Sequence, residues 1–289
     1  MRILVTGANG FIGRAVCAYA MQGGHFVYAL GSAEKSAAVC DIYLPCDLGD
    51  PARLHSVLDE TQADCCIHLA WTGLPNYTYE NSWISMKNSM HLLTIGHRAG
   101  IKHFIYAGSC FEYLNPRGRV SEDWPIKNTD AYTAAKAGVL GLARRYCQEQ
   151  QLSFHWPRLF YVMGPGQRED ALIPYVVRSL KQGQRPALRT AHNENDFIDV
   201  RDVAQALLAI AEKNPAEADV LNIGSGRATS IWSLTEEILH AFCLAEEPSL
   251  EERGPEVSFY ADITKIRQLT GWEPRIALAQ SIRDCIDSF

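Results

Sequence analysis

Short apolar runs alternate with longer stretches of helical periodicity through the first half of the chain. The apolar runs predict strands at residues 2–6, 25–30, 64–70 and 102–108, and a short strand that ends at 46–48. The stretches between them predict helices at 14–23, 51–61, 79–100 and 131–151. Strands that alternate with helices in this way indicate an α/β fold, a Rossmann-type doubly wound parallel sheet. The functional crevice of such a sheet lies beyond the carboxyl ends of its strands.

The same pattern predicts a division of the chain. We expect a dinucleotide-binding domain over residues 1–170, with later segments at about 190–225 returning to it. The portion 171–289 is expected to form most of a smaller C-terminal lobe that binds substrate.

Three glycines spaced three residues apart follow the first strand directly. Gly7 permits a tight turn, Gly10 lets the backbone approach a pyrophosphate, and Gly13 lets the next helix pack close to the strand. A tight strand-to-helix turn can also use glycine without any ligand, so the downstream residues decide between the two interpretations. The dinucleotide interpretation predicts cofactor contacts in this turn from Gly7, Asn9, Gly10, Phe11, Ile12 and Gly13.

The tip of the second strand bears on the choice of cofactor. Folds that bind NAD place an Asp or Glu there to hold the adenosine ribose, whereas this chain has Gly31 and Ser32, with Lys35 nearby. A small residue, a hydroxyl and a cation tolerate an additional phosphate, so the sequence favours NADP(H), with Ser32 in contact, and leaves NAD possible. Asp47 follows the third strand, where it can accept a hydrogen bond from adenine or serve as a turn or cap residue.

Tyr132 and Lys136 are four residues apart at the start of a helix and therefore share a face. An ammonium beside a phenol is expected to lower the phenol's pKa from its ordinary value of about 10. Ser109 ends a strand and can hold a carbonyl oxygen while Tyr132 protonates it, and Lys136 can anchor a nicotinamide ribose. His68 lies within an apolar strand and is interpreted as a core histidine with satisfied hydrogen bonds.

Composition narrows the class of protein. The chain has 289 residues, 47% of them hydrophobic and 21% charged, with a net charge of −6, which indicates a globular protein without a nucleic-acid partner. The nine cysteines lack metal-ligand spacing, so we expect reduced thiols and no metal site. No leader precedes the first strand and no apolar run has the length of a membrane span, and we therefore expect a cytoplasmic protein with no membrane association.

The ordered motifs resemble those of the extended short-chain dehydrogenase/reductase family, in particular its branch of sugar-nucleotide epimerases, dehydratases and reductases. The resemblance spans nearly the whole chain. The matching segments are 6–13, 47–48, 68–70, Asn88, Ser109 with Tyr113, Tyr132 with Lys136, 157–166, 196–204, 222–226 and 269–274. It implies that Ser109, Tyr132 and Lys136 are catalytic. It also implies that the cofactor site is lined by Asp47, Leu48, Leu69, Ala70, Asn88 and Lys136.

The residues after Ser109 distinguish reactions within this family. Dehydratases carry an Asp-Glu pair there, and this chain has Cys110 and Phe111, which cannot move a proton. The segment 108–113, with Glu112 before Tyr113, resembles the reductases of 4-keto-6-deoxysugars. We therefore hypothesise an NAD(P)H-dependent reductase of a keto group on a nucleotide-linked deoxysugar. An NAD-dependent epimerase is the alternative enzyme, and a non-catalytic protein that senses dinucleotides is the alternative from another class.

The resemblance also implies contacts with the nucleotide-sugar substrate. They are assigned to Trp71, Glu112, Tyr161, Gln167, Leu172, Arg189 and Arg253. Asn195 stands where relatives place a phosphate-binding Arg, and Arg189 is the expected substitute. Similar proteins pair two long helices from each subunit, which implies a homodimer built on a four-helix bundle from 79–100 and 131–151.

Overall fold

A parallel sheet of eight strands organises the computed structural model, which describes residues 1–184, 186–188, 190–216, 219–242 and 257–288. The strands follow the order β12-β8-β5-β4-β1-β2-β3, and β6 also pairs with β8. Their bounds are β1 Arg2–Thr6, β2 Phe26–Gly31, β3 Ile42–Pro45, β4 Cys65–His68, β5 His103–Tyr106, β6 Gly108–Ser109, β8 Ser153–Leu159 and β12 Val220–Ile223.

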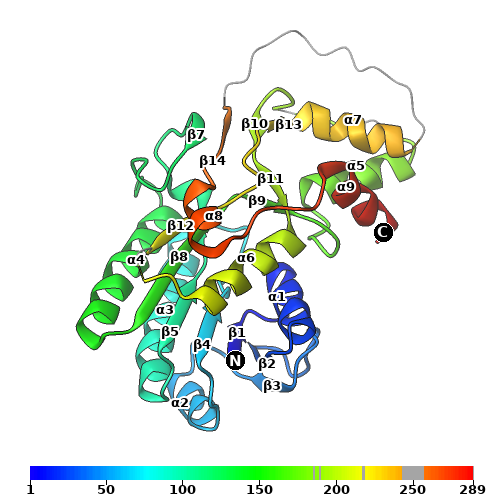
Figure 1. Ribbon diagram of the computed structural model, residues 1–289. Helices are drawn as coiled ribbons and strands as arrows, with labels where there is room; N and C mark the ends of the chain where they lie inside the picture. Colours follow the sequence, from blue (N-terminus) through cyan, green and yellow to red (C-terminus); the bar gives the residue numbers. More distant parts are fainter. Residues whose placement is uncertain (185, 189, 217–218, 243–256, 289) are drawn as a thin grey trace.

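Helices cover both faces of this sheet, because side chains alternate along each strand. Ile3 and Val5 of β1 face a core shared with α1 and α6, whereas Leu4 faces the opposite core, shared with α2, α3 and α4. Figure 1 shows the two layers of helices on either side of the strands. The helices are α1 Phe11–Gln22, α2 Pro51–Asp59, α3 Tyr79–Arg98, α4 Ala131–Gln150 and α6 Val200–Lys213. The predicted doubly wound α/β fold is confirmed.

A smaller group of helices lies beyond one end of the sheet (Figure 1). Its apolar core includes Ile173 of α5, Ile238 of α7 and Ile282 of α9. These helices are α5 Leu172–Lys181, α7 Ile231–Ala241 and α9 Leu278–Asp287, and α8 Thr264–Thr270 lies between the last two in sequence. The remaining short elements are η1 Cys110–Glu112, β7 Gly118–Val120, β9 Tyr161–Met163, β10 Glu194–Asn195, β11 Phe197–Asp199, β13 Thr229–Ser230 and β14 Phe259–Ala261.

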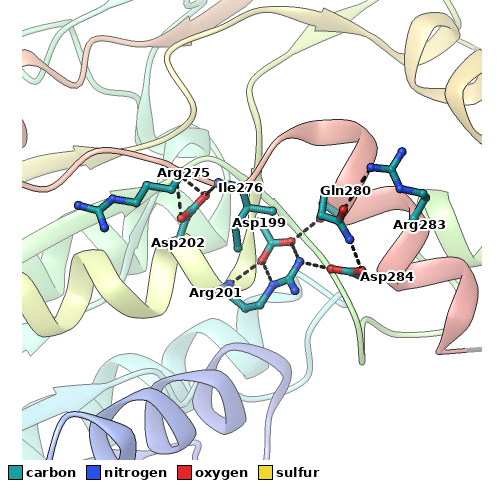
Figure 2. A network of polar contacts seen from close by, with 9 residues as sticks. Asp199, Arg201, Asp202, Arg275, Ile276, Gln280, Arg283 and Asp284 are labelled. Atoms are coloured by element: carbon teal, nitrogen blue, oxygen red, sulfur yellow. Dashed lines mark hydrogen bonds and ion pairs between the residues drawn. The ribbon is translucent and has the colours of Figure 1, made fainter.

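Buried carboxylates at the start of α6 join this helix to the C-terminal helix α9 and to the segment before it (Figure 2). Asp199 caps α6 and accepts hydrogen bonds from Arg201 and from the Ser281 hydroxyl, at 2.5 Å for the latter. Arg201 also pairs with Asp284 of α9 at 2.7 Å. Asp202 accepts hydrogen bonds from two backbone N–H groups of the segment before α9, those of Arg275 and Ile276.

The predicted strands and helices are present, with ends that differ by a few residues. The largest difference is at the first helix, which was predicted from residue 14 and begins at Phe11. The predicted strand at 102–108 is divided into β5 and β6.

Two histidines are buried as neutral bases in the sheet. His68 lies within hydrogen-bond distance of Thr6 at 2.6 Å and of Ser89 at 2.9 Å, so the interpretation of a satisfied core histidine is confirmed. His103 packs edge-on against His155, at 4.9 Å between ring centroids. Burial lowers the pKa of His68 and of His103 to about 3, with Lys136 and His155 respectively adding to the shift.

This burial predicts a loss of stability in acid. In the unfolded chain a histidine binds a proton below a pKa of about 6.5, whereas His103 in the folded protein resists protonation down to about 3. Between these values the unfolded state holds more protons, so the free energy of unfolding falls as the pH falls, by about 1.4 kcal/mol per pH unit for each such histidine. Urea unfolding between pH 6.5 and 4 should therefore show a shallower pH dependence for His103→Phe than for the wild type. Equal slopes for the two proteins would contradict the prediction.

Candidate active site

Ser109, Tyr132 and Lys136 meet at the carboxyl edge of the sheet. Ser109 ends β6, and the other two lie in the first turns of α4, which Asp130 caps through the Thr133 N–H. Tyr132 is 9% exposed and Lys136 is 6% exposed. The Ser109 side chain lies close enough to the Tyr132 phenol to influence its pKa. The structure therefore brings the three predicted catalytic side chains into one site.

Ser109 is fixed by the short helix that follows it. Its hydroxyl oxygen accepts a hydrogen bond from the Phe111 N–H at 3.2 Å, and its own N–H donates to Glu112 at 2.7 Å. This reciprocal arrangement is a capping box, which satisfies two backbone donors at the start of η1.

The Lys136 amine is enclosed. It donates to the carbonyl of Ala107 at 2.6 Å and lies 3.8 Å from the centroid of the Trp71 ring. Burial lowers the pKa of Lys136 to about 8, and the Glu112 carboxylate opposes that shift. A small cavity of about 10 Å³ borders Lys136, Trp71 and Trp156.

The expected effect of Lys136 on Tyr132 is corrected by this geometry. We expected the amine to lower the pKa of the phenol, but burial raises the pKa of Tyr132, and the nearby Ser109 side chain opposes the rise only in part. Lys136 lies 5.8 Å from the centroid of the Tyr132 ring and donates to a carbonyl instead. Tyr132 in this geometry is a protonated phenol at neutral pH, which is the form that donates a proton.

Aromatic rings enclose the phenol. Trp71, a predicted substrate contact, lies edge-on to Tyr132 at 5.4 Å, and Tyr77 lies edge-on at 4.8 Å. Tyr77 is 45% exposed and also contacts the ring of Phe111, which is 38% exposed. Sequence reasoning missed Tyr77, because it belongs to an irregular segment between β4 and α3 that has no periodicity.

Glu112 has a different place from the one predicted. Its side chain is buried, and its oxygens accept hydrogen bonds from the Ser109 N–H, the Trp156 indole and Arg158. The carboxylate is thus occupied by donors of the protein, and the structure does not show it facing a substrate. Arg158 and Trp156 were missed, although a buried Arg within an apolar strand signals a buried acidic partner.

The glycine turn has the geometry that a dinucleotide needs. Gly7 has φ +67°, and a Cβ there would lie 2.8 Å from the Ala70 N. A Cβ on Gly13 would lie 2.2 Å from the Gly7 carbonyl oxygen. No side chain caps the start of α1 at Gly10, and its first turn has no acidic residue. The end of α1 therefore presents backbone N–H groups, including those of Phe11 and Ile12, toward an anion.

The tip of β2 carries Gly31 and no ribose-binding acid. A Cβ on Gly31 would lie 3.0 Å from the Tyr43 hydroxyl, so a side chain there would require a small shift of Tyr43. Asn9 donates to Tyr43 and accepts a hydrogen bond from the Ala37 N–H, so its side chain holds the loop after β2. Ser32 is exposed in that loop.

The other predicted cofactor residues surround the same edge. Asp47 is exposed and accepts a hydrogen bond from the Gly49 N–H, whereas the cap of α2 is Asp50. Leu48 is buried, while Leu69 and Ala70 are half-buried at the end of β4. The Asn88 Oδ1 atom is buried and has no hydrogen-bond partner among the described residues. An unpaired buried oxygen of this kind is a group that a bound ligand could satisfy.

The predicted substrate contacts are only partly assembled. The ring centroids of Tyr161 and Phe111 lie 5.8 Å apart. Gln167 donates to the Val162 carbonyl, and its own side-chain oxygen is buried without a partner among the described residues. Leu172 begins α5 and packs against the apolar core that α5, α7 and α9 share. Arg189 and Arg253 lie outside the described residues. Arg14, which sequence reasoning did not select, donates to the carbonyl of Gly166 at 2.9 Å.

Neither a metal site nor a membrane-spanning helix is found in the described part of the chain. No group of three His, Cys, Asp or Glu residues there could hold a metal ion. None of the helices in the described ranges combines the length and apolar character that crossing a membrane needs.

Comparisons with known proteins agree with this geometry. The model of the NAD dependent epimerase/dehydratase family matches residues 3–224. The dTDP-6-deoxy-L-talose 4-dehydrogenase (NAD(P)(+)) of Kitasatospora kifunensis is 26% identical and covers 98% of this chain and 94% of its own length. The UDP-glucose 4-epimerase of Neisseria meningitidis serogroup A is 27% identical, and the match covers 98% of this chain and 95% of that protein.

Solved structures share the fold. The UDP-glucose 4-epimerase of Thermotoga maritima with UDP-glucose has a TM-score of 0.86 at 22% identity, covering 100% of this chain and 98% of that one. MoeE5 in complex with UDP-glucuronic acid and NAD has a TM-score of 0.83 at 25% identity, with the same coverage. The chain thus belongs to the NAD dependent epimerase/dehydratase family and is an NAD(P)-dependent enzyme that modifies sugar nucleotides.

Proposed function

We propose that the protein reduces a keto group on a nucleotide-linked deoxysugar with NAD(P)H. The observation that carries this proposal is the composition of the site around Ser109. It offers a hydroxyl, a phenol and an amine, and the half-exposed side chain that follows Cys110 is the ring of Phe111. A phenyl ring can neither donate nor accept a proton, which argues against dehydration.

The residues of the chain divide the work of such a reduction. Bound NAD(P)H would supply the hydride. The Ser109 hydroxyl donates a hydrogen bond to the carbonyl oxygen, and Tyr132 gives its proton to that oxygen as negative charge develops on it. Because burial raises the pKa of Tyr132, the phenol is in the donating form before the reaction begins. Lys136 anchors the nicotinamide ribose and supplies positive charge near the reacting oxygen.

An NAD-dependent epimerase is the second candidate. Its support is the 27% identity to a UDP-glucose 4-epimerase over nearly the whole chain. An epimerase begins by removing a proton from a sugar hydroxyl, which a phenol of raised pKa does poorly. The similarity to dTDP-6-deoxy-L-talose 4-dehydrogenases and the missing ribose-binding acid favour the reductase.

An assay of purified protein with NADPH and a panel of 4-keto-6-deoxysugar nucleotides separates the candidates. We expect stoichiometric loss of NADPH absorbance with formation of the reduced sugar nucleotide. Tyr132→Phe, which keeps the ring and removes the proton, should lower kcat by about 10²-fold to 10⁴-fold. Tightly bound NAD with redox-neutral conversion of a UDP-hexose would show an epimerase instead. Unchanged turnover in Tyr132→Phe would refute the catalytic assignment, and cofactor binding without any turnover would indicate a sensor.

We also propose that NADPH is the preferred cofactor. Support comes from the exposed Ser32 and Lys35 after β2 and from Gly31, where a side chain would contact the Tyr43 hydroxyl closely. The open position at Ser32 leaves room for a 2′-phosphate, and no acid directly repels it.

Ser32→Asp should reverse that preference, because a carboxylate repels the phosphate and accepts hydrogen bonds from ribose hydroxyls. We expect kcat/KM with NADPH to fall by about tenfold or more and kcat/KM with NADH to rise. Ser32→Asn is the isosteric control and should change both values little. A wild-type protein that already prefers NADH would contradict this proposal.

The homodimer also stays a proposal. The helices α3 and α4 pack side by side and expose large apolar side chains, with Trp83 51% exposed and Leu142 57% exposed. Such a surface is typical of a face that another subunit covers.

Trp83→Glu should therefore convert a dimer into a monomer, because the charge would be buried in the interface. Light scattering after size exclusion gives the mass directly. Val39→Glu changes an apolar residue that is 63% exposed and distant from α3 in sequence, and it should leave the mass unchanged. A monomeric wild type would end the proposal.

The proposal also includes a division of the chain near residue 170 and a cytoplasmic location. The division of the chain near residue 170 is supported by the separate apolar core of α5, α7 and α9. The cytoplasmic location is supported by the free thiols of the cysteines in the described ranges, and cell fractionation would test it.

A further inference from the structure

A buried carboxylate lies directly beneath the active site. Glu112 is 2% exposed, and three groups from two elements donate to it. The Ser109 N–H lies at 2.7 Å, the Trp156 Nε1 at 2.9 Å and the Arg158 Nε at 3.0 Å. A carboxylate this far from water is stable only because each donor is in place.

The indole of Trp156 connects this carboxylate with Lys136. The indole N–H donates to Glu112, and the ring lies 5.5 Å from the Lys136 amine, within the range of a cation–π interaction. The Trp71 ring contacts the same amine at 3.8 Å. A carboxylate that accepts a hydrogen bond from the indole N–H increases the electron density of the ring. The pair Glu112 and Trp156 therefore attracts the ammonium more strongly than an isolated indole does.

Gly108 admits this arrangement. A Cβ at that position would lie 2.3 Å from the Trp156 Nε1 and 2.8 Å from the Glu112 Oε1. Any side chain on Gly108 would therefore separate the indole from the carboxylate.

We propose that Glu112 is a positioning residue of the reaction, which fixes Ser109 through its N–H and holds Lys136 in its charged form through Trp156. The inference rests on the proposed function for its kinetic part. Its electrostatic part concerns the amine alone and can be tested without substrate.

The charges around Lys136 leave Glu112 as the group that favours the ammonium. His68 is buried beside it as a neutral base, and burial keeps Tyr132 protonated, so neither supplies a negative charge at neutral pH. The buried Cys110 thiol also has a raised pKa and stays neutral. Arg158 lies on Glu112 and repels the amine, and its own pKa is raised by the same carboxylate. Without Glu112, little would oppose the lowering of the Lys136 pKa by burial.

Two variants separate the effect of the Glu112 charge from the effect of its side-chain length. In the wild type, kcat/KM is expected to fall at alkaline pH with a midpoint near pH 8. Glu112→Gln keeps the shape of the side chain and removes its charge, so this midpoint should move to lower pH by about one unit. In Glu112→Asp the charge is kept and the side chain is shorter, so the pH of that fall should stay near the wild-type value. Its kcat should drop by about 10-fold to 100-fold, because Ser109 loses its fixed orientation.

The amine is measured directly by NMR of protein labelled with ¹³C-lysine, with Lys136→Arg to assign the signal. Glu112→Gln should lower the titration midpoint of Lys136, whether or not a sugar substrate is turned over. If the wild type has no reductase activity but Glu112→Gln still lowers the Lys136 midpoint, the proposed function is refuted and the role of Glu112 toward Lys136 is supported.

Asp199→Asn is the matched control, because Asp199 is also a buried carboxylate paired with an Arg and lies outside the site. It should lower the melting temperature and leave the pH of the alkaline fall unchanged. If Glu112→Gln keeps the wild-type Lys136 titration and kcat, or if its effects match those of Asp199→Asn, the inference is overturned. Should Glu112→Gln fail to fold, Glu112→Asp with a wild-type kcat would overturn it equally.

Discussion

The burial of one positive charge constrains the architecture around the sheet edge. Lys136 is almost fully removed from water, and the free energy of that burial must be offset by groups that favour a cation. A backbone carbonyl, two indole rings and a carboxylate provide this, and they come from four separate elements of the chain. The same charge makes a second cation unfavourable nearby, which is one reason that His68 is a neutral base.

Main-chain groups hold the reactive side chains of this site in place. Ser109 is held by its own capping box, and Lys136 is held through Ala107. On the far side of the sheet edge, Asp196 accepts hydrogen bonds from three backbone N–H groups, those of Ser225, Gly226 and Ala261. Strand ends that would otherwise be loose are thereby joined to one another, as a site that must orient a sugar requires.

The sequence predicts the elements of the fold well because periodicity and glycine spacing are local properties. The parallel sheet and the turn at Gly7 follow from such patterns, whereas the meeting of Ser109 with Tyr132 was expected from the family resemblance. The direction of the Tyr132 pKa does not, because it depends on how completely Tyr77 and Trp71 cover the phenol. Glu112 was assigned to substrate for the same reason: the sequence does not reveal that Trp156 and Arg158 of a distant strand reach its carboxylate.

The hydrogen bond between Arg14 and Gly166 links two parts of the site that different ligands would occupy. Arg14 lies in the first turns of α1, which follows the glycine turn. Gly166 precedes Gln167 and has φ +84°, a backbone conformation that favours glycine. A dinucleotide that orders the first turn of α1 thereby also restricts the loop that carries Gln167. A ligand that restricts the residues at one end of this hydrogen bond therefore also restricts those at the other end, so the two halves of the site are mechanically coupled.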